Sequence, residues 1–188
     1  MIHKVKFDDY PKQDFIDEIN RIKTPSDRRS YFSDVENIPQ IHSLPAFDWL
    51  NKKVKEEALK YFETIRGHDY NSTVVDIYAQ KSWIVELQPG GQVDWHWHKN
   101  AHLSCVFYID VPPGSCALEF GDMDWQRGLP FAVKEYMYKS AYAHFYQQDN
   151  KMHEVENGMM MVFPSLMIHG TRMSNHTEGT RLAVSYDL

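Results

Sequence analysis

Apolar residues recur at helix-like spacing in two stretches near the start of the chain. Between Asp14 and Ile22, and again between Phe47 and Ile65, most apolar side chains fall three or four positions apart. This spacing places them on one side of a helix, so each stretch predicts an amphipathic helix with one buried face. We expect these helices to brace a structure that the rest of the chain forms.

From Thr73 onward the pattern changes to short runs of β-branched and aromatic residues. These runs are TVVDIYA, KSWIVEL, LSCVFYIDV, CALEF, MMMVFP and RLAVSYDL. Turn signals such as Pro-Gly-Gly, Pro-Pro-Gly and Asn-Gly separate several of them. Several short strands without intervening helices predict a mainly β sandwich or barrel. The aromatic stretch from Tyr136 to Asp149 fits neither period and is interpreted as a loop or lid.

The length and composition of the chain suit one domain. A chain of 188 residues with 43% hydrophobic content can bury one substantial core but is short for two ordinary domains. We therefore predict a single domain over residues 1–188. Its residues 1–79 are expected to be mostly helical support, and residues 80–188 are expected to form the barrel core.

Charge and cysteine content narrow the range of partners and compartments. The net charge of −6 gives no overall basic surface, so we expect no nucleic acid and no membrane as a partner. A small molecule or a protein fits better as the substrate. Cys105 and Cys116 form no closely spaced pair, which suits a reducing cytoplasm. Neither an apolar signal-peptide core at the N-terminus nor a run of about eighteen apolar residues occurs, so we predict a soluble, cytoplasmic protein.

Three of the ten histidines crowd into the segment DWHWHKNAH. Residues two apart in a strand point to the same face, so the imidazoles of His96 and His98 can converge on one ion of borderline softness, such as Fe(II) or Zn(II). The alternating Trp95 and Trp97 are then expected on the opposite face as core anchors. For His102 we favour a structural or substrate-side role.

Another histidine follows a later buried run. The segment GMMMVFPSLMIHG predicts a strand, a turn at Pro164 and His169 just beyond that turn. A β-barrel can bring His169 close to His96 and His98. We therefore expect the three histidines to share one site.

Several short motifs follow one another along the second half of the chain. They are Ser82-Trp83, His96-Trp97-His98, Leu103 to Tyr108, Phe163-Pro164-Ser165, His169-Gly170 and Arg181 to Ser185. Their order resembles the small branch of 2-oxoglutarate/Fe(II) oxygenases found in bacteria and phages, over residues 80 to 188. The resemblance implies a mainly β fold, a double-stranded β-helix or jelly-roll barrel, braced here by the N-terminal helices.

The resemblance also implies an activity and its cofactors. It predicts an Fe(II)- and 2-oxoglutarate-dependent dioxygenase that hydroxylates or otherwise oxidises a small-molecule or protein substrate, with release of succinate and CO₂. His96, His98 and His169 would hold the metal and leave positions for the keto acid and O₂. No catalytic residue is expected beyond these metal ligands.

The third metal ligand departs from the usual pattern. Most 2-oxoglutarate oxygenases carry His-x-Asp or His-x-Glu where this chain has His96-Trp97-His98. We favour His98 as the ligand in place of that carboxylate. The open alternatives are Asp94, Glu119, Asp122 and Asp124.

The far carboxylate of 2-oxoglutarate requires a fixed cation, and the planar fork of arginine pairs two oxygens at once. Arg181, twelve residues after His169, is the candidate for this role. Alternation along RLAVSYD puts Arg181 and Ser185 on one face, so that a hydroxyl lies near the guanidinium. Tyr108, on the strand after the histidine cluster, is a second candidate donor.

Two other functions stay open at this point. The segments from Gly91 to His98 and from Gly158 to Asn175 loosely resemble the two motifs of cupins, which share the barrel and often use three histidines without 2-oxoglutarate. The other alternative is a non-catalytic barrel that only binds a ligand or a partner. Arg181 favours the oxygenase, because a cupin has no general need for that cation.

Overall fold

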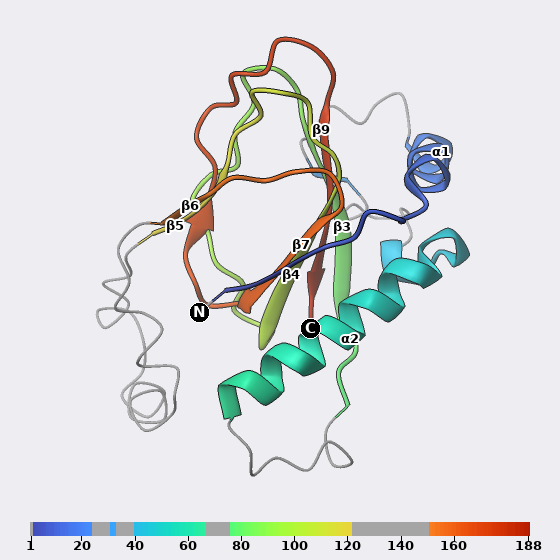
Figure 1. Cartoon of the computed structure of the whole chain (residues 1–188), viewed down its shortest axis with the longest axis vertical. Coiled ribbons are helices and arrows are strands. Elements are labelled where there is room, and N and C mark those ends of the chain that lie inside the picture. Colours follow the sequence, from blue (N-terminus) through green and yellow to red (C-terminus); the bar gives the residue numbers. More distant parts are fainter. Residues whose placement is uncertain (1, 24–30, 33–39, 67–75, 122–150) are drawn as a thin grey trace.

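The computed structural model describes residues 2–23, 31–32, 40–66, 76–121 and 151–188. In this part of the chain two antiparallel sheets and two α-helices make up most of the regular structure (Figure 1). None of the helices described is long and apolar enough to cross a membrane.

The larger sheet has six strands in the order β1-β7-β4-β9-β3-β2, with every neighbouring pair antiparallel. Its central strands β4 and β9 pair the middle of the chain with its C-terminal end. The bounds are β1 (His3–Lys6), β2 (Tyr31–Phe32), β3 (Lys81–Leu87), β4 (Leu103–Asp110), β7 (Met159–Pro164) and β9 (Arg181–Asp187).

The smaller sheet has three strands in the order β6-β5-β8. These are β5 (Leu118–Phe120), β6 (Lys151–His153) and β8 (His169–Gly170). Side chains of β5 pack against one face of the larger sheet. The opposite face of the larger sheet is covered by α1 (Lys12–Ile22), α2 (Asp48–Arg66) and the short 3₁₀ helices η1 (Ile41–Ser43) and η2 (Pro45–Phe47) (Figure 1).

The two faces of the larger sheet bury two separate cores. In β4, Cys105 and Phe107 point to the helix-side core, where they meet side chains such as Phe15 of α1. Their neighbours Val106 and Tyr108 point the other way, into the inter-sheet core shared with β5. Successive side chains of a strand face opposite sides, so burial of both faces explains why this segment reads as a continuous apolar run.

Most of the predicted elements are confirmed. The helices expected between residues 14 and 22 and between 47 and 65 are α1 and α2, and five of the six predicted strands are β3, β4, β5, β7 and β9. The N-terminal part adds two strands, β1 and β2, to its expected helices. The proposed lid from Tyr136 to Asp149 lies outside the described residues, and the interpretation of residues 1–188 as one domain stays a prediction.

The run TVVDIYA predicts a strand, and this prediction is wrong for the described part of the run, because residues 76–79 form no strand. The Asp76 side chain accepts a hydrogen bond from the backbone N–H of Ile77 at 3.0 Å and forms an ion pair with Lys55 at 2.6 Å. Such local bonds from a side chain to the backbone compete with strand pairing. Residues 73–75 lie outside the described part.

Phe107 offers a test of the helix-side core. Its buried ring lies 5.2 Å from that of Tyr10 and 6.3 Å from that of Phe15, measured between centroids. Phe107→Ala should lower the free energy of unfolding by about 3 to 5 kcal/mol, because it leaves a cavity between α1 and the sheet. Tyr78→Ala, at a side chain that is 70% exposed, should change it by less than about 0.5 kcal/mol. Urea denaturation measures both, and equal losses would contradict this account of the core.

Candidate metal centre

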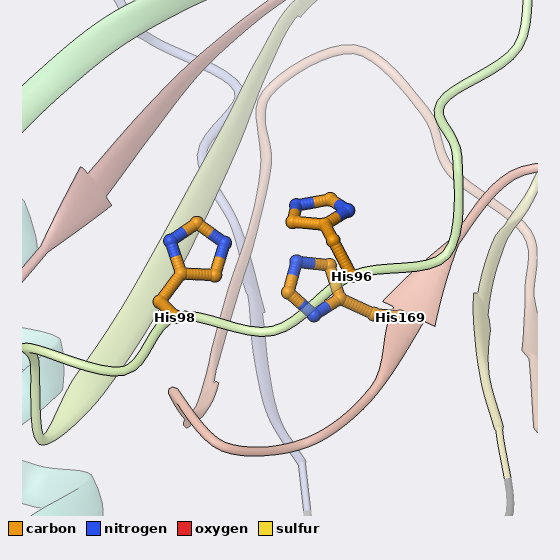
Figure 2. Close-up of side chains that lie close together, drawn as sticks. All are labelled: His96, His98 and His169. Atoms are coloured by element: carbon orange, nitrogen blue, oxygen red, sulfur yellow. The ribbon is translucent and has the colours of Figure 1, made fainter.

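Three histidines from two distant segments meet at one end of the inter-sheet core. One nitrogen atom from each of His96, His98 and His169 lies within 4.8 Å of the others. Their ring centroids are 4.4 to 5.2 Å apart. Figure 2 shows the rings of His96 and His98, carried by one loop, close to that of His169 on β8.

Backbone pairing holds the two segments together. His96 and His169 form an isolated antiparallel bridge in which the N–H of each donates to the carbonyl of the other at 3.0 Å. The N–H of His98 donates to Ser165 O at 2.9 Å. A side chain on Gly170 would come within 3.0 Å of Val93 O. Glycine therefore permits the close approach that the bridge requires.

The expected extended strand at the histidine pair is replaced by this single bridge, although the rings still converge. The expectation that Trp95 and Trp97 anchor the core is wrong. Their side chains are 48% and 43% exposed. No third layer covers the outer side of this loop in the described part of the chain, so both indoles lie at the surface beside the histidines.

Each histidine has its Nδ1 atom engaged. His96 Nδ1 donates to Asp94 O at 2.7 Å, and His169 Nδ1 donates to Met167 O at 2.8 Å. His98 Nδ1 lies 2.8 and 3.1 Å from the two carboxylate oxygens of Asp187. Because these acceptors require a proton on Nδ1, the neutral form of each ring presents the lone pair of Nε2.

Burial keeps the site in the form that binds metals. His169 is 7% exposed, and burial lowers its pKa to about 3, helped by the neighbouring His96. Burial also lowers the pKa of His96. Metal binding requires deprotonated imidazoles, so at neutral pH these two rings need lose no proton to bind an ion.

Aromatic side chains fix the orientation of the rings. Trp83 stacks on His98 with a centroid distance of 5.4 Å and an interplanar angle of 21°. Phe163 meets His169 nearly edge-on at 4.9 Å. The sequence motifs contain both residues, but their contacts with the histidines follow only from the packing of β3 and β7.

The carboxylate alternatives for the third ligand do not join the cluster. The Asp94 side chain is exposed and accepts a hydrogen bond from Gln92 at 3.3 Å. Glu119 forms an ion pair with Arg172 at 2.8 Å. His102 is exposed and also lies outside the cluster, which is the one candidate metal group in the described residues. Asp122 and Asp124 lie outside the described part of the chain.

A pocket beside the histidines contains the predicted cation. Arg181, Tyr108 and Ser185 line the same pocket as the three histidines. Leu182 and Val184 point instead into the helix-side core, so the predicted alternation along β9 is confirmed.

Arg181 is buried without a counter-charge among the described residues. It is 2% exposed, and its guanidinium carbon lies 4.8 Å from the centre of the Tyr108 ring. Neither Arg181 Nε nor the Tyr108 hydroxyl has a hydrogen-bond partner in the described part of the chain. Burial raises the pKa of Tyr108 to about 12, so the hydroxyl keeps its proton at neutral pH and can donate it to a bound anion.

Comparison with known families decides the class of the protein. Residues 81–187 match the family described as "Putative 2OG-Fe(II) oxygenase". The chain belongs to this family. The oxygenase is therefore an oxidoreductase whose cofactors are Fe(II) and the co-substrate 2-oxoglutarate, as predicted, and the match does not support the cupin-like or non-catalytic alternatives. No curated protein matches its sequence.

Solved structures share the fold of the oxygenase. HygX from Streptomyces hygroscopicus, with nickel and 2-oxoglutarate bound, is 13% identical with a TM-score of 0.57, covering 98% of this chain and 80% of HygX. AviO1 from Streptomyces viridochromogenes Tue57 is 13% identical with a TM-score of 0.57, and the match covers 100% of this chain and 89% of AviO1. A Pseudomonas putida prolyl-4-hydroxylase is 12% identical with a TM-score of 0.56, and the match covers 100% of this chain and 86% of the hydroxylase. These likenesses confirm the jelly-roll fold class.

The Arg181 Nε atom without a hydrogen-bond partner predicts a stability cost in the oxygenase without 2-oxoglutarate. A buried polar group without a partner costs about 1 to 3 kcal/mol, so Arg181→Met should raise the free energy of unfolding by a similar amount. The matched control Arg21→Met replaces an exposed arginine of α1 and should change it by less than about 0.5 kcal/mol. Urea denaturation without 2-oxoglutarate measures both. A destabilised Arg181→Met variant would show that this arginine has a structural partner.

Proposed function

We propose that His96, His98 and His169 hold Fe(II) through their Nε2 atoms and that Arg181 binds the far carboxylate of 2-oxoglutarate. The enzyme then oxidises a small-molecule or protein substrate, with release of succinate and CO₂. One observation carries the proposal: three imidazoles and a buried guanidinium whose Nε atom lacks a partner line the same pocket.

The donor set suits the metal. Imidazole nitrogen is a ligand of intermediate softness that Fe(II) accepts, and three protein ligands leave further positions for a bidentate keto acid and O₂. The three hydrogen bonds at Nδ1 orient the rings before a metal binds, so that each ring presents its Nε2 atom as a ligand. Iron bound here supplies the activation of O₂ that couples decarboxylation of the keto acid to oxidation of the substrate.

The residues around the metal site bind the co-substrate and exclude water. Arg181 can donate two parallel hydrogen bonds to one carboxylate, and the hydroxyls of Tyr108 and Ser185 lie on the same pocket wall. The remaining wall is largely apolar, with side chains such as Val93 and Phe163. An apolar wall strengthens the pairing between guanidinium and carboxylate, because little water competes for either group.

The open side of the site suits a small-molecule substrate. Trp95 and Trp97 flank His96 in the chain and expose about half of their surface, so they offer flat apolar contacts on the loop that carries His96 and His98. A structure of HygX contains hygromycin B together with nickel and 2-oxoglutarate. This supports a small molecule ahead of a protein as the substrate of the present enzyme.

The proposed ligand set predicts the behaviour of two histidine variants. Under anaerobic conditions the wild-type protein should bind about one Fe(II) per chain, and air should then trigger succinate release from 2-oxoglutarate. His169→Ala should lose both, because the most buried ligand is removed. The control His42→Ala replaces a histidine that bonds to Ser82 outside the cluster and should retain both. Metal analysis and succinate chromatography measure the outcome, and wild-type iron affinity in His169→Ala would refute the site.

The role of Arg181 predicts a graded loss of co-substrate binding. A bidentate, charge-assisted pair in a buried site contributes about 2 to 3 kcal/mol, so Arg181→Ala should weaken 2-oxoglutarate binding by roughly tenfold or more. Arg181→Lys should recover only part of this loss, because an ammonium group lacks the planar fork. Anaerobic calorimetry with the iron-loaded protein measures all three affinities. An unchanged affinity in Arg181→Ala would place the carboxylate elsewhere.

A further inference from the structure

His98 differs from the other two histidines in what holds its ring. His96 and His169 each donate Nδ1–H to a backbone carbonyl two residues earlier in the chain. The corresponding carbonyl for His98 is that of His96, and the bridge already uses it to accept the N–H of His169. His98 donates instead to the carboxylate of Asp187.

Asp187 is held in place by the centre of the larger sheet. It is the last residue of β9, where it pairs in register with Ser104 of β4 and Lys81 of β3. Ser104 Oγ donates to its carboxylate at 3.2 Å. The face of the His98 ring also stacks on the indole of Trp83. The carboxylate and the indole together fix both the position and the plane of the His98 ring.

We propose that Asp187 is a positioning residue of the metal centre. It holds His98 with its proton on Nδ1 and its lone pair on Nε2, and it places a negative charge behind a ligand set that is itself neutral. A carboxylate bonded to the far nitrogen of a ligating imidazole fixes its tautomer and raises its basicity. The proposal rests on the proposed function, in which His98 is a metal ligand.

The proposal predicts that Asp187 acts on the metal only through His98. Asp187→Asn keeps the shape of the side chain but removes its charge, and its amide N–H can donate to Nδ1 and favour the tautomer that blocks Nε2. Anaerobic competition with a chelator should show Fe(II) affinity falling by about 10- to 100-fold. In a His98→Ala background, Asp187→Asn should cause no further loss beyond about twofold.

The matched control is Asp110→Asn. Asp110 lies at the other end of the same β4–β9 pair and forms an ion pair with Lys12 at 2.7 Å. Its replacement also removes a carboxylate from this strand pair, so an effect of sheet stability alone would appear in both variants. We expect the Fe(II) affinity of Asp110→Asn to equal that of the wild type.

A second readout can overturn the proposal with the wild-type protein alone. In ¹⁵N-resolved NMR spectra of the zinc-loaded wild-type protein, His98 should show a protonated Nδ1 with a downfield proton signal. In Asp187→Asn this signal should shift or disappear, while those of His96 and His169 stay. Absence of a protonated Nδ1 on His98 in the wild type would overturn the proposal by itself.

The outcomes separate the two levels of inference. If His98→Ala binds Fe(II) as tightly as the wild type, the proposed ligand set is wrong. If His98→Ala loses affinity but Asp187→Asn does not, the ligand set stands and the role of Asp187 is wrong. Equal losses from Asp187→Asn in both backgrounds would also overturn it, because they would show a general structural effect.

Discussion

The pair of backbone hydrogen bonds between His96 and His169 is the constraint on which the metal centre depends. Further backbone hydrogen bonds extend this pairing in both directions. At one end Gly90 N–H donates to Ser174 O, and at the other end His98 N–H donates to Ser165 O. Two segments that lie about seventy residues apart are thereby aligned antiparallel, as in a sheet. The alignment places one histidine opposite another, and the carbonyl of His96 accepts the N–H of His169. The bridge therefore brings together the histidines that we propose as metal ligands.

In the pocket beside the histidines, the buried Arg181 lowers the stability of the folded protein but is available to bind an anion. Burial of the Arg181 guanidinium against the Tyr108 ring leaves Nε without a hydrogen-bond partner among the described residues. In the proposed function the carboxylate of the keto acid satisfies this group, so part of the free energy lost on folding would be recovered when the co-substrate binds. Cores elsewhere in the described part are closely packed around apolar side chains such as Phe107. Such cores can offset the cost of one buried cation whose Nε atom lacks a partner.

The sequence predicts elements whose signal is local, and it misses those that depend on long-range register. The helix α1 and the strands β4 and β9 follow from periodicity within their own residues. The two-residue strand β8 carries no such signal, because it is defined by its pairing with β5 and by the bridge to His96. Asp187 reads as an ordinary acidic residue at the end of a strand. Its contact with His98, 89 positions away in the chain, follows from the β4–β9 register and the bridge together.

The proposed ligand set is neutral, which changes where negative charge lies around the metal. In the usual triad of two histidines and a carboxylate, one negative charge touches the metal directly. Here the carboxylate of Asp187 contacts the Nδ1 atom of His98 and so lies behind the ring of that proposed ligand. Because Coulomb attraction falls with distance, a metal held by the three proposed ligands would keep more of its positive charge for the anionic co-substrate. Arg181 adds a second cation in the same pocket. With the proposed ligand set, the site would attract a dianion, and its hold on the metal would depend more on ring orientation than on charge.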